Sequence, residues 1–218
     1  MGSKDFKGKM KYRHFIWDFD GTLYDTYGEI TYVILSVLEA RSVKEEYDKI
    51  FKNLHISLTH TLAMLSNDHE IDPEILKKEF TAAEEAMNVE KAQPFSGTLK
   101  LLRACEGFNF MVTNRGASVF RFLDSKDYHK YFTEVMYRDS GLPLKPSSAT
   151  VDFLISKYGL QKEDILFIGD RDIDLRCAKN AGVDSCYFDS HDILNTVECR
   201  YYTKDLNDLY DILSSDKG

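Results

Sequence analysis

Short unbroken apolar runs recur along the chain, and segments with helical periodicity separate them. Strands that are buried on both faces have this hydrophobic pattern, because helices cover both sides of a parallel sheet. The alternation of strand and helix predicts an α/β protein with a doubly wound parallel sheet. The runs are FIWDF (15–19), FNFMVT (108–113), DILFIGD (164–170) and SCYFD (185–189), with a weaker one at EVMYRD (134–139).

The segment 24–93 breaks this alternation, because it shows helical periodicity alone. Apolar residues recur at helical spacing from Ile30 to Leu38, and a second long helix is expected after Pro73. The segment returns toward the predicted sheet near Pro94, where the chain becomes rich in turn formers. The sequence therefore predicts a small all-helical domain inserted after the first strand.

The remaining helical segments fit between the strands of the predicted sheet. Gly159 and Gly182 each follow one of them, at the position where helices commonly stop. We therefore predict a Rossmann-like core domain of residues 11–23 and 94–218. Residues 1–10 are expected to be disordered or left over from cloning. The helices of the core are expected at 96–105, 147–157, 172–180 and 206–213.

The charge balance and the cysteines limit the classes of function. A formal net charge of −8 over 218 residues argues against a nucleic-acid-binding surface, which needs clustered Lys and Arg. The four cysteines form no CxxC pair, and no apolar run approaches the roughly 18 residues of a membrane-spanning helix. We expect a cytoplasmic protein that binds neither nucleic acid nor membrane, as a monomer or a weak dimer.

Two carboxylates follow the first apolar run, in the stretch HFIWDFDGTLYDT (14–26). A turn explains Asp20 and Gly21, because Asp-Gly is a common turn pair. Asp18 lies between two aromatic residues, where an ionised carboxylate needs a partner or a metal. Because residues i and i+2 of a strand point to one face, we expect Asp18 and Asp20 in one site, with a hard cation such as Mg²⁺ offsetting their repulsion.

Polar residues also stand at two later points. Thr113 and Asn114 follow FNFMV, and their hydroxyl and amide suit phosphate oxygens, although such residues also cap helices. Lys145 precedes Pro146, which favours an extended backbone at a helix entrance and allows the ammonium to face an anion. Most lysines are merely solvated, so neither signal identifies a site by itself.

The stretch FIGDRDID (167–174) ends another predicted strand and contains three aspartates. If a helix begins here, Asp170 and Asp174 share a face and Asp172 does not. A favourable interaction with the helix dipole accounts for Asp172, whereas Asp170 is the better candidate metal ligand. Because the carboxyl ends of parallel strands meet at one edge of a sheet, all four polar clusters are expected to converge.

The order of these four motifs resembles that of the haloacid dehalogenase superfamily. DFDGTL, Thr113-Asn114, Lys145-Pro146 and GDRDID follow one another as in that family, over a core of about residues 14–189. The first and fourth motifs are highly specific for this family, and the middle two are specific only when they occur together with the others. A helical insertion just after the first motif is similar to the cap domain of phosphoglycolate phosphatase and β-phosphoglucomutase relatives.

The resemblance implies a role for each matched carboxylate. Asp18 would be the nucleophile that becomes an aspartyl phosphate, and Asp20 the general acid and then the general base. Asp18, the backbone carbonyl of Asp20 and Asp170 would hold Mg²⁺. Asp174 would lie behind them, hydrogen-bonded to a ligand or a metal-bound water.

The phosphate-binding residues and the reaction class follow from the same resemblance. Thr113, Asn114 and Lys145 would bind the phosphoryl group that is transferred. Relatives that cleave carbon–halogen bonds lack an acid at the position of Asp20, so its presence favours phosphate esters. The implied activity is that of a Mg²⁺-dependent phosphoric monoester hydrolase acting on a small phosphorylated metabolite.

Two alternatives and several details stay open at this stage. A sugar phosphomutase of the β-phosphoglucomutase kind would use the same core residues, and a non-catalytic phosphate-binding protein would share the fold. The predicted cap, residues 24–93, carries no signature of one substrate. Arg115 is bulkier than expected beside Asn114 and could contact substrate or pack under the cap.

Overall fold

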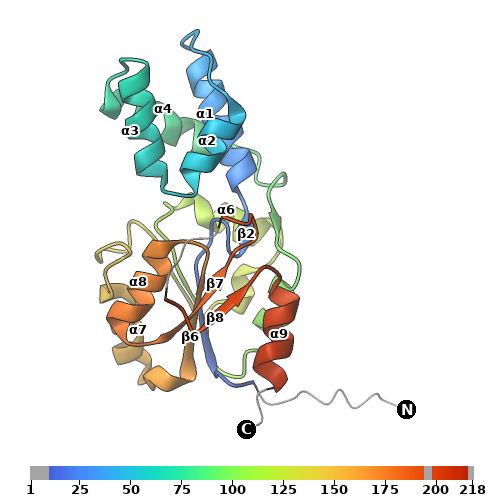
Figure 1. Ribbon diagram of the computed structural model, residues 1–218. Helices are drawn as coiled ribbons and strands as arrows, with labels where there is room; N and C mark the ends of the chain where they lie inside the picture. The colour runs from blue at the N-terminus through green and yellow to red at the C-terminus, as the bar shows by residue number, and fades with distance from the viewer. Residues whose placement is uncertain (1–9, 194–197, 216–218) are drawn as a thin grey trace. The chain divides into compact units, whose positions relative to one another are not determined.

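The computed structural model describes residues 10–193 and 198–215 (Figure 1). The chain forms two compact units, one from the described residues up to Leu23 and from Pro94 onward, the other from 24–93. Most of the predicted disordered tail lies outside the described residues, but Met10 is buried. Among the helices of the described part, none has the length and apolar character needed to cross a bilayer.

The first unit contains a six-stranded sheet in which every pairing is parallel. Its strands are β1 (His14–Trp17), β4 (Asn109–Val112), β5 (Glu134–Met136), β6 (Ile165–Gly169), β7 (Asp184–Phe188) and β8 (Tyr201–Thr203). They lie in the order β5-β4-β1-β6-β7-β8. The predicted α/β fold class is therefore confirmed, and β8 is an additional edge strand.

Helices cover both faces of this sheet. They are α5 (Thr98–Ala104), α6 (Ser118–Ser125), α7 (Ala149–Tyr158), α8 (Asp172–Ala181) and α9 (Leu206–Ser215), with short 3₁₀ turns at His129–Tyr131 and Lys162–Asp164. In Figure 1, α7 and α8 lie together on one face and α9 lies on the other. Ile16, Phe110 and Phe167 from three strands form a core with Val151 of α7 and Ala178 of α8.

The strand order creates a position in the sheet at which ligands commonly bind. The chain leaves β1 toward β4 on one side, whereas it leaves the neighbouring β6 toward β7 on the other. Parallel sheets open a crevice at the carboxyl ends of two such strands. Trp17 and Ile168 are paired at these ends, and the Asp18 amide donates a hydrogen bond to the Ile168 carbonyl at 2.9 Å. Asp18 and Asp170 thus follow the two strands that flank this point.

The second unit is helical and has its own apolar core. It contains α1 (Tyr27–Glu39), α2 (Tyr47–Leu54), α3 (Leu58–Asp68) and α4 (Pro73–Ala86). Asp72 caps α4 by accepting hydrogen bonds from the amides of residues 74 and 75. Where the chain leaves the first unit and returns to it, β2 (Tyr24–Asp25) and β3 (Gln93–Pro94) form a two-stranded sheet. The core includes Ile30, Ile34, Leu38, Ile50, Leu65, Leu76 and Phe80.

Candidate active site

Asp18 is a buried carboxylate whose two oxygens have different surroundings. Its side chain is 1% exposed, and Oδ1 contacts Lys145 Nζ at 2.7 Å and accepts a hydrogen bond from the Phe19 amide at 2.7 Å. Oδ2 accepts no hydrogen bond from the residues that the structure describes, and Arg171 Nη2 lies 3.8 Å away. A buried oxygen in this state indicates a place for a ligand, because burial without a hydrogen-bond partner is unfavourable.

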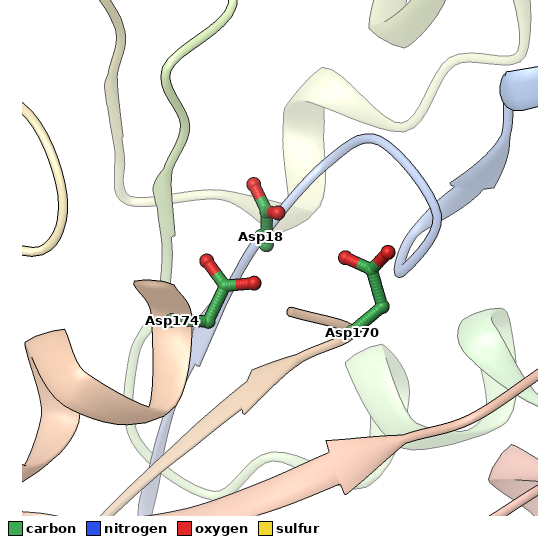
Figure 2. A group of neighbouring side chains, drawn as sticks. All are labelled: Asp18, Asp170 and Asp174. Carbon is green, nitrogen blue, oxygen red and sulfur yellow. The ribbon is translucent and has the colours of Figure 1, made fainter. Parts of the chain in front are cut away.

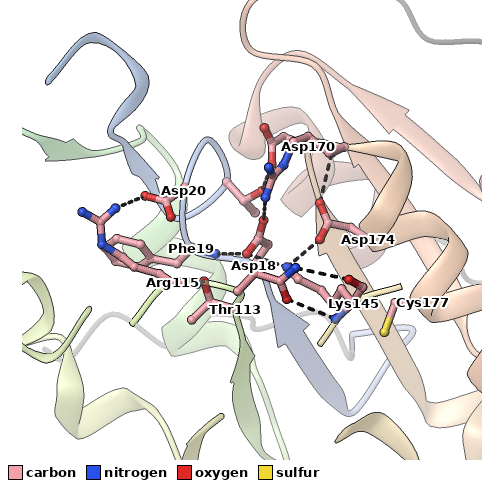
Figure 3. Close-up of polar contacts among 12 residues, drawn as sticks. Asp18, Phe19, Asp20, Thr113, Arg115, Lys145, Asp170, Asp174 and Cys177 are labelled. Carbon is pink, nitrogen blue, oxygen red and sulfur yellow. Dashed lines mark hydrogen bonds and ion pairs between the residues drawn. The ribbon is translucent and has the colours of Figure 1, made fainter. Parts of the chain in front are cut away.

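Lys145 links the carboxylates of two different loops. Its side chain is fully buried, and Nζ lies 2.7 Å from Asp18 Oδ1 and 2.6 Å from Asp174 Oδ1 (Figure 3). Burial alone would lower the pKa of this ammonium, but the charges of Asp174 and Asp18 outweigh it and raise the pKa above its usual value. Lys145 is therefore a permanent cation at neutral pH.

Asn114 holds the backbone of Lys145. Its side-chain amide donates to the Lys145 carbonyl at 3.2 Å and accepts from the Lys145 amide at 3.1 Å. Because both ends of the Asn114 amide are engaged in this way, its role in this structure is to fix the lysine loop. Thr113, predicted beside it, is buried and accepts a hydrogen bond from the Arg115 amide through Oγ1.

Asp174 contacts both the start of α8 and Lys145. Its Oδ2 accepts a hydrogen bond from the Arg171 amide at 3.0 Å, which caps the helix, while Oδ1 contacts Lys145. Burial and the nearby Asp18 charge raise the pKa of Asp174, although Lys145 opposes the shift. Asp172 lies in the first turn of α8 and forms an exposed ion pair with Arg176, as a residue of the helix start.

Gly169 allows Asp174 to lie this close to the sheet. A Cβ at position 169 would lie 2.3 Å from Asp174 Cβ. We expect Gly169→Ala to lower the free energy of unfolding by about 1–3 kcal/mol, because the start of α8 must move away. Urea denaturation measures this loss. Gly28→Ala, in α1, is the matched control. Its added Cβ would lie at an ordinary 3.4 Å from the Tyr47 hydroxyl, so this substitution should not destabilise the protein. Equal effects of the two substitutions would refute the packing argument.

Three carboxylates converge at the carboxyl edge of β1 and β6. One oxygen from each of Asp18, Asp170 and Asp174 lies within 4.8 Å of the others (Figure 2). Asp170 is 9% exposed, and its Oδ1 accepts a hydrogen bond from Thr22 Oγ1 at 3.2 Å. A buried donor set made only of carboxylate oxygens fits a hard cation such as Mg²⁺. Because Asp174 is already engaged by the helix start and Lys145, Asp18 and Asp170 are the better ligand candidates.

Asp20 lies apart from this group of three carboxylates. Its Oδ1 accepts a hydrogen bond from Arg115 Nη1 at 2.5 Å, and Figure 3 shows its carboxylate turned toward Arg115. We expected Asp18 and Asp20 to share one face of a strand, but β1 ends at Trp17, so both lie in the following loop, where strand alternation no longer holds. Their side chains therefore have separate partners.

Two arginines, Arg171 and Arg115, lie at the site although the sequence does not predict them there. Arg171 precedes α8, and its guanidinium approaches Asp18. The sequence signal for this contact is a basic residue inside the acidic stretch GDRDID. For Arg115 the sequence offers only the size of the side chain as a signal. Its partner Asp20 is 95 residues away, so no local pattern could connect them.

The chain also matches known proteins over most of its length. Residues 15–188 match the family described as haloacid dehalogenase-like hydrolase. The chain belongs to this family. The resemblance seen in the motifs is thereby confirmed, and the protein is an enzyme of a hydrolase family.

Solved structures support the same fold. A hydrolase from Streptococcus pneumoniae TIGR4 is 26% identical with a TM-score of 0.62, covering 94% of this chain and 99% of that one. A predicted phosphoglycolate phosphatase from Haemophilus somnus 129pt is 19% identical (TM-score 0.78; 94% and 99% covered). The HAD-hydrolase YfnB from Bacillus subtilis, described as bound to magnesium, is 19% identical (TM-score 0.73; 93% and 99% covered). No curated protein matches the chain.

Proposed function

We propose that this enzyme is a Mg²⁺-dependent phosphatase that hydrolyses a small phosphate monoester through an aspartyl phosphate on Asp18. The state of the Asp18 carboxylate carries the proposal. Lys145 and the Phe19 amide fix Oδ1, whereas Oδ2 is buried and accepts no hydrogen bond from the described residues. A nucleophile that is oriented through one oxygen and available through the other is suited to attack on phosphorus.

In the first displacement, Asp18 Oδ2 forms a bond to phosphorus and the bond from phosphorus to the ester oxygen breaks. Asp20, in its protonated form, gives its proton to the leaving oxygen, so that an alcohol departs. The Lys145 ammonium offsets the charge that gathers as a carboxylate approaches a phosphate dianion. The nearby thiol of Cys177 does not compete, because burial raises its pKa to about 12 and keeps it neutral at pH 7.

In the second displacement, Asp20 acts as the general base. The Asp20 carboxylate takes a proton from water, and the water oxygen attacks the phosphorus of the aspartyl phosphate. The bond to Asp18 Oδ2 breaks, inorganic phosphate forms, and both aspartates return to their starting states. Thr113 stands at the carboxyl end of β4, where its hydroxyl can donate to a phosphoryl oxygen.

Asp18 and Asp170 are the side chains that would hold Mg²⁺, with the Asp20 backbone carbonyl as the third ligand that the family pattern implies. When bound, the ion supplies positive charge that screens the repulsion between carboxylate and phosphate. The fit rests on the converging carboxylate oxygens of Asp18, Asp170 and Asp174.

Removal of divalent cations is expected to abolish phosphate release, because the three carboxylates then repel the phosphate dianion. The measurement is release of inorganic phosphate from p-nitrophenyl phosphate with Mg²⁺, with EDTA, and with EDTA followed by excess Mg²⁺. We expect loss with EDTA and recovery after the addition of Mg²⁺. Full activity in EDTA would contradict the proposed role of the ion.

A screen of phosphorylated metabolites for phosphate release would identify the substrate class. It should be run beside a coupled assay for glucose 1-phosphate isomerisation. Phosphate release without isomerisation is the outcome that we expect. Isomerisation without net phosphate release would show instead that the same residues serve a phosphomutase.

A further inference from the structure

Arg115 and Asp20 form an ion pair that the proposed reaction does not by itself require. Arg115 Nη1 donates to Asp20 Oδ1 at 2.5 Å, and their side chains are 1% and 16% exposed (Figure 3). The two residues come from the loops that follow β4 and β1. A buried guanidinium is unfavourable unless its charge and its donors are matched, so this contact has to be explained.

The position of the guanidinium is fixed by groups other than Asp20. Arg115 Nε donates to Ser118 Oγ at 3.0 Å, and the guanidinium carbon lies 4.8 Å from the centre of the Phe122 ring and 5.6 Å from that of Phe19. Ser118 and Phe122 belong to α6, a regular element of the first unit. Arg115 is thus held by a helix and by aromatic rings.

The backbone of Arg115 is fixed as well. Its amide donates to Thr113 Oγ1 at 3.1 Å, and its carbonyl accepts from the Arg138 amide at 2.9 Å. Asp20, in contrast, lies in a loop after the end of β1. Arg115 is therefore an anchored partner for the Asp20 carboxylate.

We infer that Arg115 is a positioning residue that orients Asp20 for proton exchange with the leaving oxygen; this inference rests on the proposed phosphatase function. Proton transfer depends steeply on geometry, and a positioned acid contributes roughly 10²–10⁴-fold to the rate. Its contribution is large when the leaving oxygen is basic and small when the leaving group departs readily as an anion. Loss of Arg115 should therefore matter more for one kind of ester than for another.

The test compares phenyl phosphate with p-nitrophenyl phosphate, which differ chiefly in the basicity of the leaving oxygen. Arg115→Met removes the charge but keeps an unbranched side chain against the rings. We expect its kcat/KM for phenyl phosphate to fall about tenfold more than its kcat/KM for p-nitrophenyl phosphate. Arg115→Lys should recover part of the difference, because it restores a cation without the planar fork.

Two further variants separate positioning from other roles. Asp20→Asn should show the same dependence on the leaving group, and adding Arg115→Met to it should cause little further loss, because the two residues act as one unit. Arg103→Met is the matched control: Arg103 is exposed and donates to the Tyr131 hydroxyl at 3.2 Å, so its variant should behave like the parent. Thermal unfolding of each variant checks that it is folded.

Several results would overturn the inference. An equal loss on both esters would assign Arg115 a structural role, and a rise in KM alone would make it a substrate contact. If Arg115→Met does not fold, Arg115→Lys still decides the question, because positioning predicts an unequal loss for it. A parent enzyme that releases phosphate from neither ester contradicts the proposed function itself, which is a different failure.

Discussion

Asp18→Asn is expected to abolish phosphate release from every ester that the parent enzyme hydrolyses. The amide keeps the shape of the side chain and an acceptor for the Phe19 amide, but it is not a nucleophile toward phosphorus. We expect kcat to fall by roughly 10³-fold or more, the scale seen when a covalent nucleophile is removed. Steady-state assays of purified parent and variant in Mg²⁺ measure the change.

Asp172→Asn is the matched control for this prediction. Asp172 lies in the same GDRDID stretch as Asp170, but it is about half exposed and paired with Arg176. The same chemical substitution at this position should leave kcat close to that of the parent. An Asp18→Asn enzyme as active as Asp172→Asn would rule out Asp18 as the nucleophile.

Lys145→Met is expected to lower the free energy of unfolding by about 3–5 kcal/mol, because it leaves two buried carboxylates without their shared cation. Asp18 and Asp174 both contact the Lys145 ammonium and are at most 1% exposed. Urea denaturation in EDTA measures the loss without compensation by a divalent ion. Phosphatase activity should disappear in the same variant.

Lys179→Met provides the comparison for the buried lysine. Lys179 pairs with Glu198 at 2.8 Å, but both side chains are largely exposed. Exposed pairs contribute between about 0 and 1 kcal/mol, so this variant should unfold close to the parent. If the two lysine variants lose similar amounts of stability, then Lys145 is not the electrostatic centre of the site.

The strands of the core could be predicted from the sequence because burial on both faces leaves a clear mark. The apolar runs correspond to β1, β4, β6 and β7, and the weaker run at 134–139 contains β5. β8 (Tyr201–Thr203) was missed because three residues with polar groups make no apolar run. In the second unit, the short α2 and α3 were missed for a related reason, since few turns give little periodicity.

The membership of the site could be predicted in part, whereas the pairing of its residues could not. Asp18, Lys145 and Asp174 stand in recognisable motifs, and the structure brings them together. That Asn114 would hold the lysine loop, or that Arg115 would bind Asp20, depends on how separate loops pack. Such contacts arise from tertiary structure, so no recognisable spacing pattern in the sequence predicts them.

The most direct test of the central claim is to trap phosphate on Asp18. The enzyme is mixed with a ³²P-labelled phosphate ester in Mg²⁺ and quenched in acid within milliseconds, and the protein is then separated, digested and analysed for label. We predict label on the peptide that contains Asp18, released by mild base as expected of an acyl phosphate, and no label in Asp18→Asn. Active enzyme that carries no label at any quench time, or label on another residue, would contradict the account.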